Sequence, residues 1–426
     1  MNFLVNRLRG DKTIWAVVVL LALISFLPVY SASTNLVYVI GKGSTIGYLF
    51  KHLAHLFIGF IIIFWIHKIP YHIFRALSLI GIPIVILLLI YTLFQGTTIG
   101  GANASRWIQI PFIGIGFQTS TLAFTVLMVY VARYLAKVSD KEYSFKDSLL
   151  ELWAPVFGVL ALVLPANFST TALIFSMVCM LVYVGQYPLK YLAIIIGAGV
   201  IALTFFILVA KAFPDAMPNR VDTWISRVDS FMDGKDDASD DDYQIEKAKI
   251  AIASGKINGL GPGKSVQKNF LPQSSSDFIF AIIVEEYGLI GAIGIIFLYM
   301  LLFIRFIINA QKASTLFGKL LIIGLGFPII FQALINMAVA VELLPVTGQT
   351  LPLISAGGTS IWMTCISIGI ILSVTKKEDE VAQDAEESKK REEALQRIID
   401  KEIQVSEDET TDNNETSNPL EPILNQ

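Results

Sequence analysis

The sequence contains very little cysteine: only Cys179 and Cys365 among 426 residues. Both lie in apolar segments, so we expect no disulfide framework and interpret the two residues as small buried hydrophobes. Charged residues are also scarce, at 16%, whereas 54% of the residues are hydrophobic and 28 are phenylalanine. This composition lies outside the range of soluble proteins, and the long apolar runs predict a polytopic membrane protein.

The few charges are unevenly distributed along the chain. Residues 376–426 hold 7 Lys or Arg and 16 Asp or Glu, so this segment carries −9 and the rest of the chain +6. We therefore expect a membrane domain, residues 1–375, followed by an acidic cytoplasmic tail, residues 376–426, that is partly disordered. The first part of the tail, residues 378–403, is rich in Glu, Lys and Ala and could form a helix.

The apolar runs predict an all-α membrane domain with about ten transmembrane helices of roughly 17–25 residues each. Lys and Arg in the short loops concentrate on one side of these spans, which places both termini in the cytoplasm. The loop of about residues 211–287 is then extracytoplasmic, and short interfacial helices are expected in it. The predicted spans are 14–32, 47–66, 73–94, 117–136, 149–164, 168–186, 189–210, 288–309, 318–341 and 352–374.

The helical pattern of residues 277–310 is too long for a single span. One straight helix of this length would measure about 50 Å, well beyond the hydrocarbon core, so a break is expected at Gly288 or Gly291. Residues 277–287 would then form a separate short helix. Because broken segments at membrane depth occur only beside protein cavities, we expect this helix to lie beside an outward-facing cavity.

Asp277 stands where a polar run, Pro272–Ser276, meets this apolar helix. A carboxylate in this place can be a helix N-cap or a functional acid or base. The preceding serines could supply the cap without it. The residues alone leave both roles open.

Four blocks of sequence, taken together, form a specific pattern. They are Asn103-Ala104-Ser105-Arg106-Trp107-Ile108, Asn167-Phe168-Ser169-Thr170, Gly259–Gly288 with its Leu271-Pro272 and Asp277-Phe278, and Leu344–Ser360. In this combination they resemble the SEDS family of membrane proteins (FtsW, RodA and SpoVE), over roughly residues 10–375. The run Ser265-Val266-Gln267-Lys268 favours the division branch of the family over the elongation branch.

The resemblance implies a peptidoglycan glycosyltransferase in the bacterial cytoplasmic (inner) membrane, acting at the division septum. It would polymerise lipid II, the undecaprenyl-pyrophosphate-linked disaccharide-pentapeptide. Asp277 aligns with the family's catalytic aspartate and would take the proton from the acceptor hydroxyl as general base. No dedicated metal site is expected, although a divalent cation could accompany the pyrophosphate leaving group. Residues expected to bind the sugar or the pyrophosphate are Arg106, Lys264, Ser265, Lys268, Glu285, Thr347 and Ser355.

The resemblance also implies partner proteins, and the sequence differs from the family pattern at four positions. A single-span class B penicillin-binding protein (a transpeptidase) and other division membrane proteins are expected, and no nucleic acid.

The glutamate and lysine that the family usually carries after its R-W-I block are Thr121 and Phe124 here. The glutamate and histidine that usually precede the aspartate are Gln273 and Ser275, which leaves Asp277 as the only acid between residues 271 and 277.

Other functions fit parts of the pattern. A lipid II flippase or another transporter suits ten spans and a polar cavity. A carrier needs its site near the middle of the membrane, however, whereas the charges here gather at the predicted outer surface. An elongation-type polymerase and a non-catalytic scaffold for the transpeptidase are the remaining alternatives.

Overall fold

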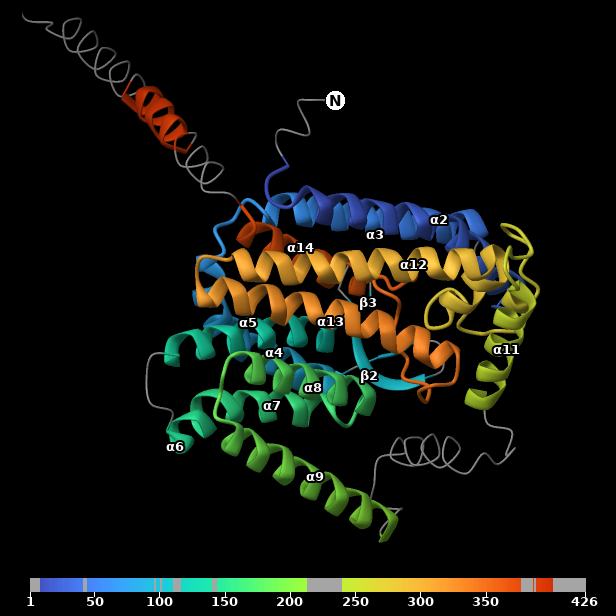
Figure 1. The fold of residues 1–426 in the computed structure, drawn as a ribbon, viewed down its shortest axis with the longest axis horizontal. Helices are drawn as coiled ribbons and strands as arrows, with labels where there is room; N and C mark the ends of the chain where they lie inside the picture. Colours follow the sequence, from blue (N-terminus) through green and yellow to red (C-terminus); the bar gives the residue numbers. More distant parts are fainter. Residues whose placement is uncertain are drawn as a thin grey trace, which may run out of the picture. The chain divides into compact units, whose positions relative to one another are not determined.

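The computed structural model describes residues 8–40, 44–95, 97–99, 102–109, 116–139, 144–212, 240–376, 386 and 388–400. Residues Met1–Thr375 form one compact unit and Lys376–Gln426 a second. Described residues are mostly helical (Figure 1). In the first unit, seven of the described helices are long and apolar enough to cross a membrane. The prediction of a helical multi-pass membrane protein is therefore confirmed, while the number of ten spans and their orientation stay predictions.

Each predicted span coincides with helical structure. The fifth begins as a short helix, α6 (Phe145–Ser148), passes through a π-helical turn, η1 (Leu149–Trp153), and continues as α7. The helices that match the spans are α2 (Lys12–Ile40), α3 (Thr45–Ile66), α4 (His72–Gln95), α5 (Thr119–Val138), α7 (Ala154–Val163), α8 (Phe168–Val184), α9 (Leu189–Ala212), α12 (Ile279–Lys312), α13 (Leu316–Ala340) and α14 (Thr359–Val374).

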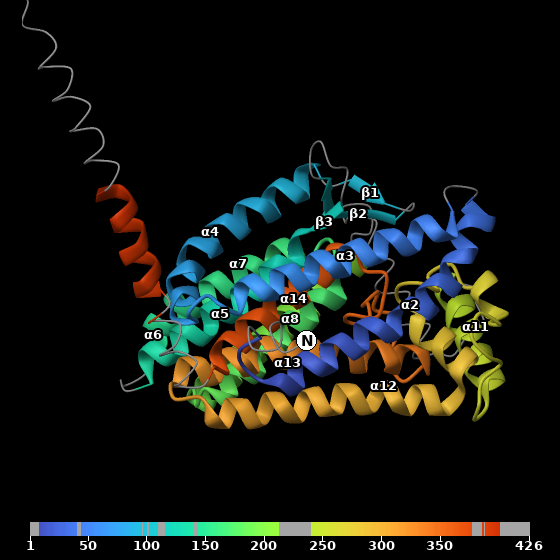
Figure 2. The same cartoon turned by 90° about the horizontal axis from the view of Figure 1, so that it is seen from above.

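The helices of the first unit lie side by side. In Figure 2, α12 runs along one edge of this unit and α4 along the opposite edge. α12 packs against α2 and α13, α3 packs against α14, and α4 packs against α5. Large apolar side chains remain exposed along α3 and α4, such as Phe57 at 68% and Phe94 at 80%. In a multi-pass membrane protein such side chains are those that face lipid.

The loop before α12 contains helical structure at one end of the bundle. Helix α11 (Asp240–Gly255) lies across the end of α12 and contacts it (Figure 1). A short 3-10 turn, η3 (Gln267–Asn269), contacts α2 and α11. These two elements match the short helices expected in this loop. The same loop contains an acidic run, residues 233–242, most of which lies outside the described residues.

A small sheet joins α4 and α5, which the all-α prediction did not include. Strands β1 (Thr97–Ile99), β2 (Ala102–Gln109) and β3 (Gly116–Gln118) pair antiparallel in the order β1-β2-β3. Trp107 of β2 is the partner of both Thr97 and Gln118. A local signal existed in the sequence, because a Thr-Thr-Ile run followed by Gly100-Gly101 is typical of a β-hairpin. The prediction treated this stretch only as a short loop.

The expected break in α12 occurs at Gly288, which has φ 65° and ψ −164°. Backbone groups freed by the break pair with the preceding loop: the N–H of Leu260 donates to the Glu285 carbonyl at 2.9 Å, and the N–H of Leu289 donates to the Lys256 carbonyl at 2.9 Å. A Cβ on Gly288 would lie 2.2 Å from the Ile257 carbonyl oxygen. The close approach and the positive φ together require glycine.

The last predicted span, 352–374, began too early. Helix α14 starts at Thr359, and residues 351–358 form a non-helical segment in which Leu353 and Gly358 have positive φ. Leu351–Ser355 are nevertheless buried. The sequence predicted a helix here because the helix-breaking residues of the 351–358 segment, Pro352 and Gly357-Gly358, stand near its two ends. Buried irregular backbone at membrane depth needs hydrogen-bond partners in the protein. The Ala356 N–H donates to the Ser275 carbonyl in the turn that carries Asp277, the Leu351 N–H donates to the Ser355 hydroxyl oxygen, and the Pro352 carbonyl accepts from the Tyr299 hydroxyl.

In the second unit, residues 388–400 are helical. Leu395, Ile398 and Ile399 are exposed on this helix. The remainder of the predicted tail helix, 378–403, and the part expected to be disordered, 406–426, lie largely outside the described residues.

Candidate active site

Asp277 lies in a turn directly before α12 and is half-buried. The N-cap position of α12 is taken by Phe278, whose side chain forms no capping bond. The preceding serines, which the sequence offered as possible caps, do not cap this helix. The Ser274 hydroxyl donates to the Ala32 carbonyl instead, and the Ser276 hydroxyl donates to the side-chain oxygen Oε1 of Gln273 at 3.0 Å. Neither Asp277 nor a serine occupies the cap position of α12.

The turn around Asp277 is tied to the segment between α13 and α14. The hydroxyl of Ser355 donates to the Ser276 carbonyl at 2.6 Å, and the N–H of Ala356 donates to the Ser275 carbonyl at 2.9 Å. Ser355 also accepts a bond from the Leu351 N–H at 2.7 Å. Ser355 was predicted to bind substrate. In the structure it is buried and fixes the backbone just before the aspartate.

Asn336 of α13 also holds the same turn. Its Nδ2 donates to the carbonyl of Asp277 at 2.6 Å and to the carbonyl of Gln349 at 2.7 Å. The side chain is buried. One amide thus fixes the aspartate's backbone and the Thr347–Thr350 stretch together. Sequence reasoning missed Asn336, although an amide side chain in an apolar helix is a recognisable signal.

The carboxylate of Asp277 faces a glycine. Gly348 has φ 66°, and a Cβ built on it would lie 3.6 Å from Asp277 Oδ2. The glycine at this position keeps a side chain from packing directly against the carboxylate. Thr347, one of the predicted substrate residues, is half-buried in the same stretch. The structure thus brings Asp277, Ser355 and the Thr347 segment together.

The two glutamates that follow serve another purpose. Glu285 is fully buried and accepts bonds from the Ser265 hydroxyl and from the N–H groups of Val266 and Gln267, at 2.9 and 3.2 Å to Oε1. Both oxygens of this carboxylate therefore hold the 265–267 segment. Such charge-assisted bonds favour a positioning role for Glu285 and Ser265.

Glu286 is also buried, at 1% exposure. Its Oε1 accepts a bond from the Ser31 hydroxyl of α2, while Oε2 has no hydrogen-bond partner in the described part of the chain. Lys268 reaches the same place: its Nζ donates to Ser31 at 3.0 Å and to the Gly263 carbonyl at 2.8 Å. Ser31 therefore links the lysine to the glutamate.

The predicted cations differ in their surroundings. Lys268 is half-buried and bonded as described, whereas Lys264 is exposed. Arg106 lies in β2, but its side chain is outside the part that the structure describes. Among the described residues there is no group of three or more His, Cys, Asp or Glu side chains that could hold a metal ion.

The chain is similar to known proteins in sequence and in fold. The family of cell cycle proteins FtsW, RodA and SpoVE matches residues 11–380. A protein of Geobacter sp. (strain M18) bearing the name "Probable peptidoglycan glycosyltransferase FtsW" is 31% identical over 382 residues, which cover 87% of this chain and 98% of that protein. A Marinobacter nauticus protein of the same name is 34% identical over 323 residues, covering 73% of this chain and 75% of the relative.

Solved structures agree at the level of the fold. A chain from a peptidoglycan synthase complex that coordinates polymerization and crosslinking matches with a TM-score of 0.65 and 23% identity, over 86% of this chain and 97% of that chain. The rod shape determining protein RodA of Thermus thermophilus matches with a TM-score of 0.61 and 22% identity, over 86% and 96% of the two chains. Sequence and fold together lead to one assignment: the chain belongs to the FtsW, RodA and SpoVE family of cell cycle proteins.

Proposed function

We propose that this protein is a peptidoglycan glycosyltransferase that polymerises lipid II into glycan strands, with Asp277 as general base. The relatives at about 30% identity carry the name of this activity and cover most of the chain. The attacking hydroxyl of the acceptor sugar loses its proton to Asp277 as it displaces undecaprenyl pyrophosphate from the anomeric carbon of the donor. No covalent enzyme intermediate is needed.

The observation that carries the proposal is the contrast among three carboxylates. Glu285 and Glu286 are buried, and Glu285 uses both of its oxygens to hold the 265–267 segment. Asp277 is half-buried, and its turn is fixed by Asn336 and Ser355. A base must be held in place and still reach its substrate, and this combination suits Asp277 better than either glutamate.

The remaining predicted residues take three roles under this proposal. Lys264, Lys268 and Arg106 meet the charge that develops on the pyrophosphate. Glu285, Ser265 and Ser355 position the loop and the turn, while Thr347 lines the acceptor side next to Gly348. If a divalent cation accompanies the reaction, oxygens of the substrate's phosphates supply most of its ligands.

The proposal extends to place and partners. We place the protein in the cytoplasmic (inner) membrane at the division septum, together with a single-span class B penicillin-binding protein and other division proteins. The names of the relatives support this setting. So does the fold shared with a chain of a synthase complex in which polymerization and crosslinking are coordinated.

The test is reconstitution of the full chain with its cognate transpeptidase in the presence of lipid II. Glycan polymer resolved by gel electrophoresis is the expected product. Movement of lipid II across vesicles without polymer would instead establish a transporter. A fluorescent fusion that forms a band at mid-cell supports the division role, and a dispersed signal along the side wall would assign the protein to elongation.

A further inference from the structure

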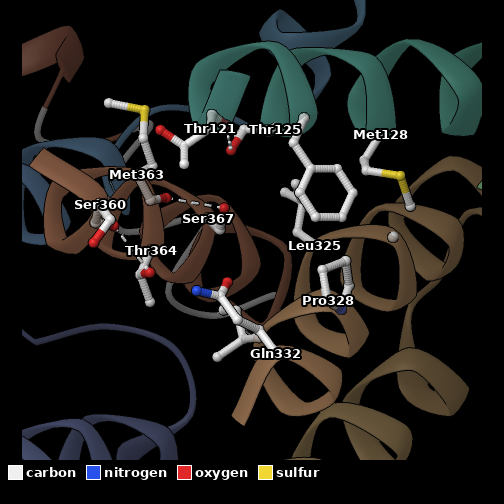
Figure 3. A pocket seen from close by; sticks show the side chains of 13 residues that line it. Thr121, Thr125, Met128, Leu325, Pro328, Gln332, Ser360, Met363, Thr364 and Ser367 are labelled. Atoms are coloured by element: carbon white, nitrogen blue, oxygen red, sulfur yellow. Dashed lines mark hydrogen bonds between the residues drawn. The ribbon is translucent and has the colours of Figure 1, made fainter. Parts of the chain in front are cut away.

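A cavity lies between α5, α13 and α14, and no residue of the turn that carries Asp277 lines it. Its volume is about 50 Å³, and it is partly open to the surroundings. Among the described residues that line it, none is charged, yet half of the lining is polar. Figure 3 shows these side chains directed toward a common space from three helices: Thr121, Thr125, Gln332, Ser360, Thr364 and Ser367.

The five hydroxyls of this lining already use their protons within the protein. Those of Thr125, Thr364 and Ser367 donate to the carbonyl four residues earlier, at 3.2, 3.1 and 3.0 Å. Those of Thr121 and Ser360 donate to the carbonyl three residues earlier, at 2.8 and 3.0 Å. A hydroxyl has one proton and two lone pairs, so each of these oxygens can still accept from, or coordinate, a ligand.

Two more oxygens add to this set of acceptors: the side-chain oxygen of Gln332 and a backbone carbonyl that a proline leaves without its donor. Nε2 of Gln332 donates to the Thr350 carbonyl at 3.0 Å, which leaves the amide oxygen as its free group. Pro328 lies inside α13 and also lines the cavity. Because proline has no N–H, the carbonyl of Gly324, another lining residue, loses its donor four residues later. The cavity therefore offers neutral oxygen acceptors and no spare charged group.

We propose that this cavity is a binding site for a small monovalent cation such as Na⁺ or K⁺. Hydroxyl, amide and backbone oxygens are the ligands that alkali ions find inside membrane proteins, often where a helix is interrupted. A divalent ion would need carboxylates to offset its larger dehydration cost, and the lining has none. The cation holds α5, α13 and α14 together at the level of Thr350, one helical turn of α13 from Asn336.

The test measures thermal unfolding of the purified full-length protein in detergent. NaCl, KCl and choline chloride are titrated at constant total ionic strength. A ligand that binds only the folded state raises the melting temperature with saturation, so Na⁺ or K⁺ should give a saturable rise of a few degrees and choline none. An equal response to all three salts would overturn the proposal and leave a cavity that holds only water.

Variants locate the effect. The double variant Thr125→Val with Ser367→Ala removes two of the oxygens, and the half-saturating cation concentration should rise at least tenfold. Thr204→Val is the matched control, because Thr204 makes the same bond to the Val200 carbonyl at 2.9 Å but lies exposed on α9. An unchanged half-saturation in the double variant contradicts the site.

Pro328→Ala provides a second variant that does not depend on removing hydroxyls. The new N–H supplies a donor to the Gly324 carbonyl and takes that oxygen from the cation. The cation response should therefore weaken, while unfolding without alkali cation should occur at the same or a higher temperature. A response as strong as that of the wild type would contradict coordination by this carbonyl.

Discussion

At the level of single residues, Asn336 is the amide on which the position of Asp277 depends. It is buried and bonds two carbonyls that belong to different segments. Its Oδ1 has no hydrogen-bond partner in the described part of the chain. A buried polar atom without a hydrogen-bond partner costs free energy, so the two bonds that the Asn336 amide does make are expected to matter for stability or function.

We therefore predict that Asn336→Leu lowers kcat for glycan polymerisation by about a hundredfold, with a smaller change in KM for lipid II. Loss of the amide leaves two partly buried carbonyls without this donor and allows the base to move, and a displacement of about 1 Å can have such an effect. Met337→Leu is the control, since Met337 is its buried neighbour and the volume hardly changes. Equal kcat values for the two variants would contradict a positioning role.

Glu285 gives a second prediction at this scale. Glu285→Gln keeps the shape of the side chain but weakens bonds from three donors in the 265–267 segment. The variant should lose about 1–3 kcal/mol of stability, measured by denaturant or thermal unfolding in detergent. Glu246→Gln on the exposed side of α11 should be neutral. If both substitutions were neutral, the carboxylate would have no anchoring role.

At the level of elements, the break at Gly288 decides how the loop meets α12. Gly288→Ala would place a Cβ 2.2 Å from a backbone oxygen and force a side chain into a conformation that only glycine adopts readily. We expect a loss of at least about 3 kcal/mol, or failure to fold. Gly294→Ala in the same helix, where a Cβ meets nothing within 4 Å, should be tolerated or slightly stabilising. Similar melting temperatures for both variants would show that the break is not required.

The same region shows what a sequence can and cannot predict. The break in α12 was predictable because length alone forbids one straight span, and glycine marks the place. The partners of the break were not, since Leu260 and Glu285 pair across 25 residues with no pattern between them. The late start of α14 was missed because buried non-helical backbone has the same apolar composition as a helix.

Within the candidate site, the aspartate was predictable and its supports were not. Asp277 was conspicuous as a carboxylate beside an apolar run, and the family resemblance added its proposed role. Ser355 and Glu285 were expected to face substrate, because polar residues near a site attract that interpretation. Their hydrogen bonds to the turn and to the loop become visible only when tertiary packing brings segments 79 and 20 residues apart into contact.

At the level of the whole first unit, Asp11, near the start of the chain, is hydrogen-bonded to α12 and to the residue that follows α14. Its carboxylate accepts bonds from Arg305 Nε at 2.9 Å and Asn309 Nδ2 at 2.6 Å, both on α12. Its N–H donates to the Thr375 hydroxyl at 3.0 Å, directly after α14. The residue before the first long helix is thus joined to the end of α12 and to the end of α14.

This link predicts a dependence of stability on pH. Burial by itself raises the pKa of Asp11, but bonds from Asn309, Arg305 and the backbone of Ile14 and Thr13 together hold that pKa below its ordinary value of 3.8. A lowered pKa in the folded state means that the contribution is complete above pH 3.8 and is lost as pH falls through the lower folded value. Asp11→Asn should therefore lower the melting temperature at pH 7, and the difference from the wild type should shrink below pH 3.8. A difference that is constant across this range would contradict the linkage.

The central claim is that Asp277 acts as the base in glycan polymerisation, and one measurement tests it most directly. Wild-type protein and Asp277→Asn, each reconstituted with the cognate transpeptidase, are supplied with lipid II and assayed for glycan polymer. Melting temperature and lipid II binding are measured on the same preparations. We predict that Asp277→Asn remains folded, still binds lipid II and forms polymer at least a hundredfold more slowly, as expected for loss of a general base. Polymer formation by Asp277→Asn at the wild-type rate would contradict the assignment.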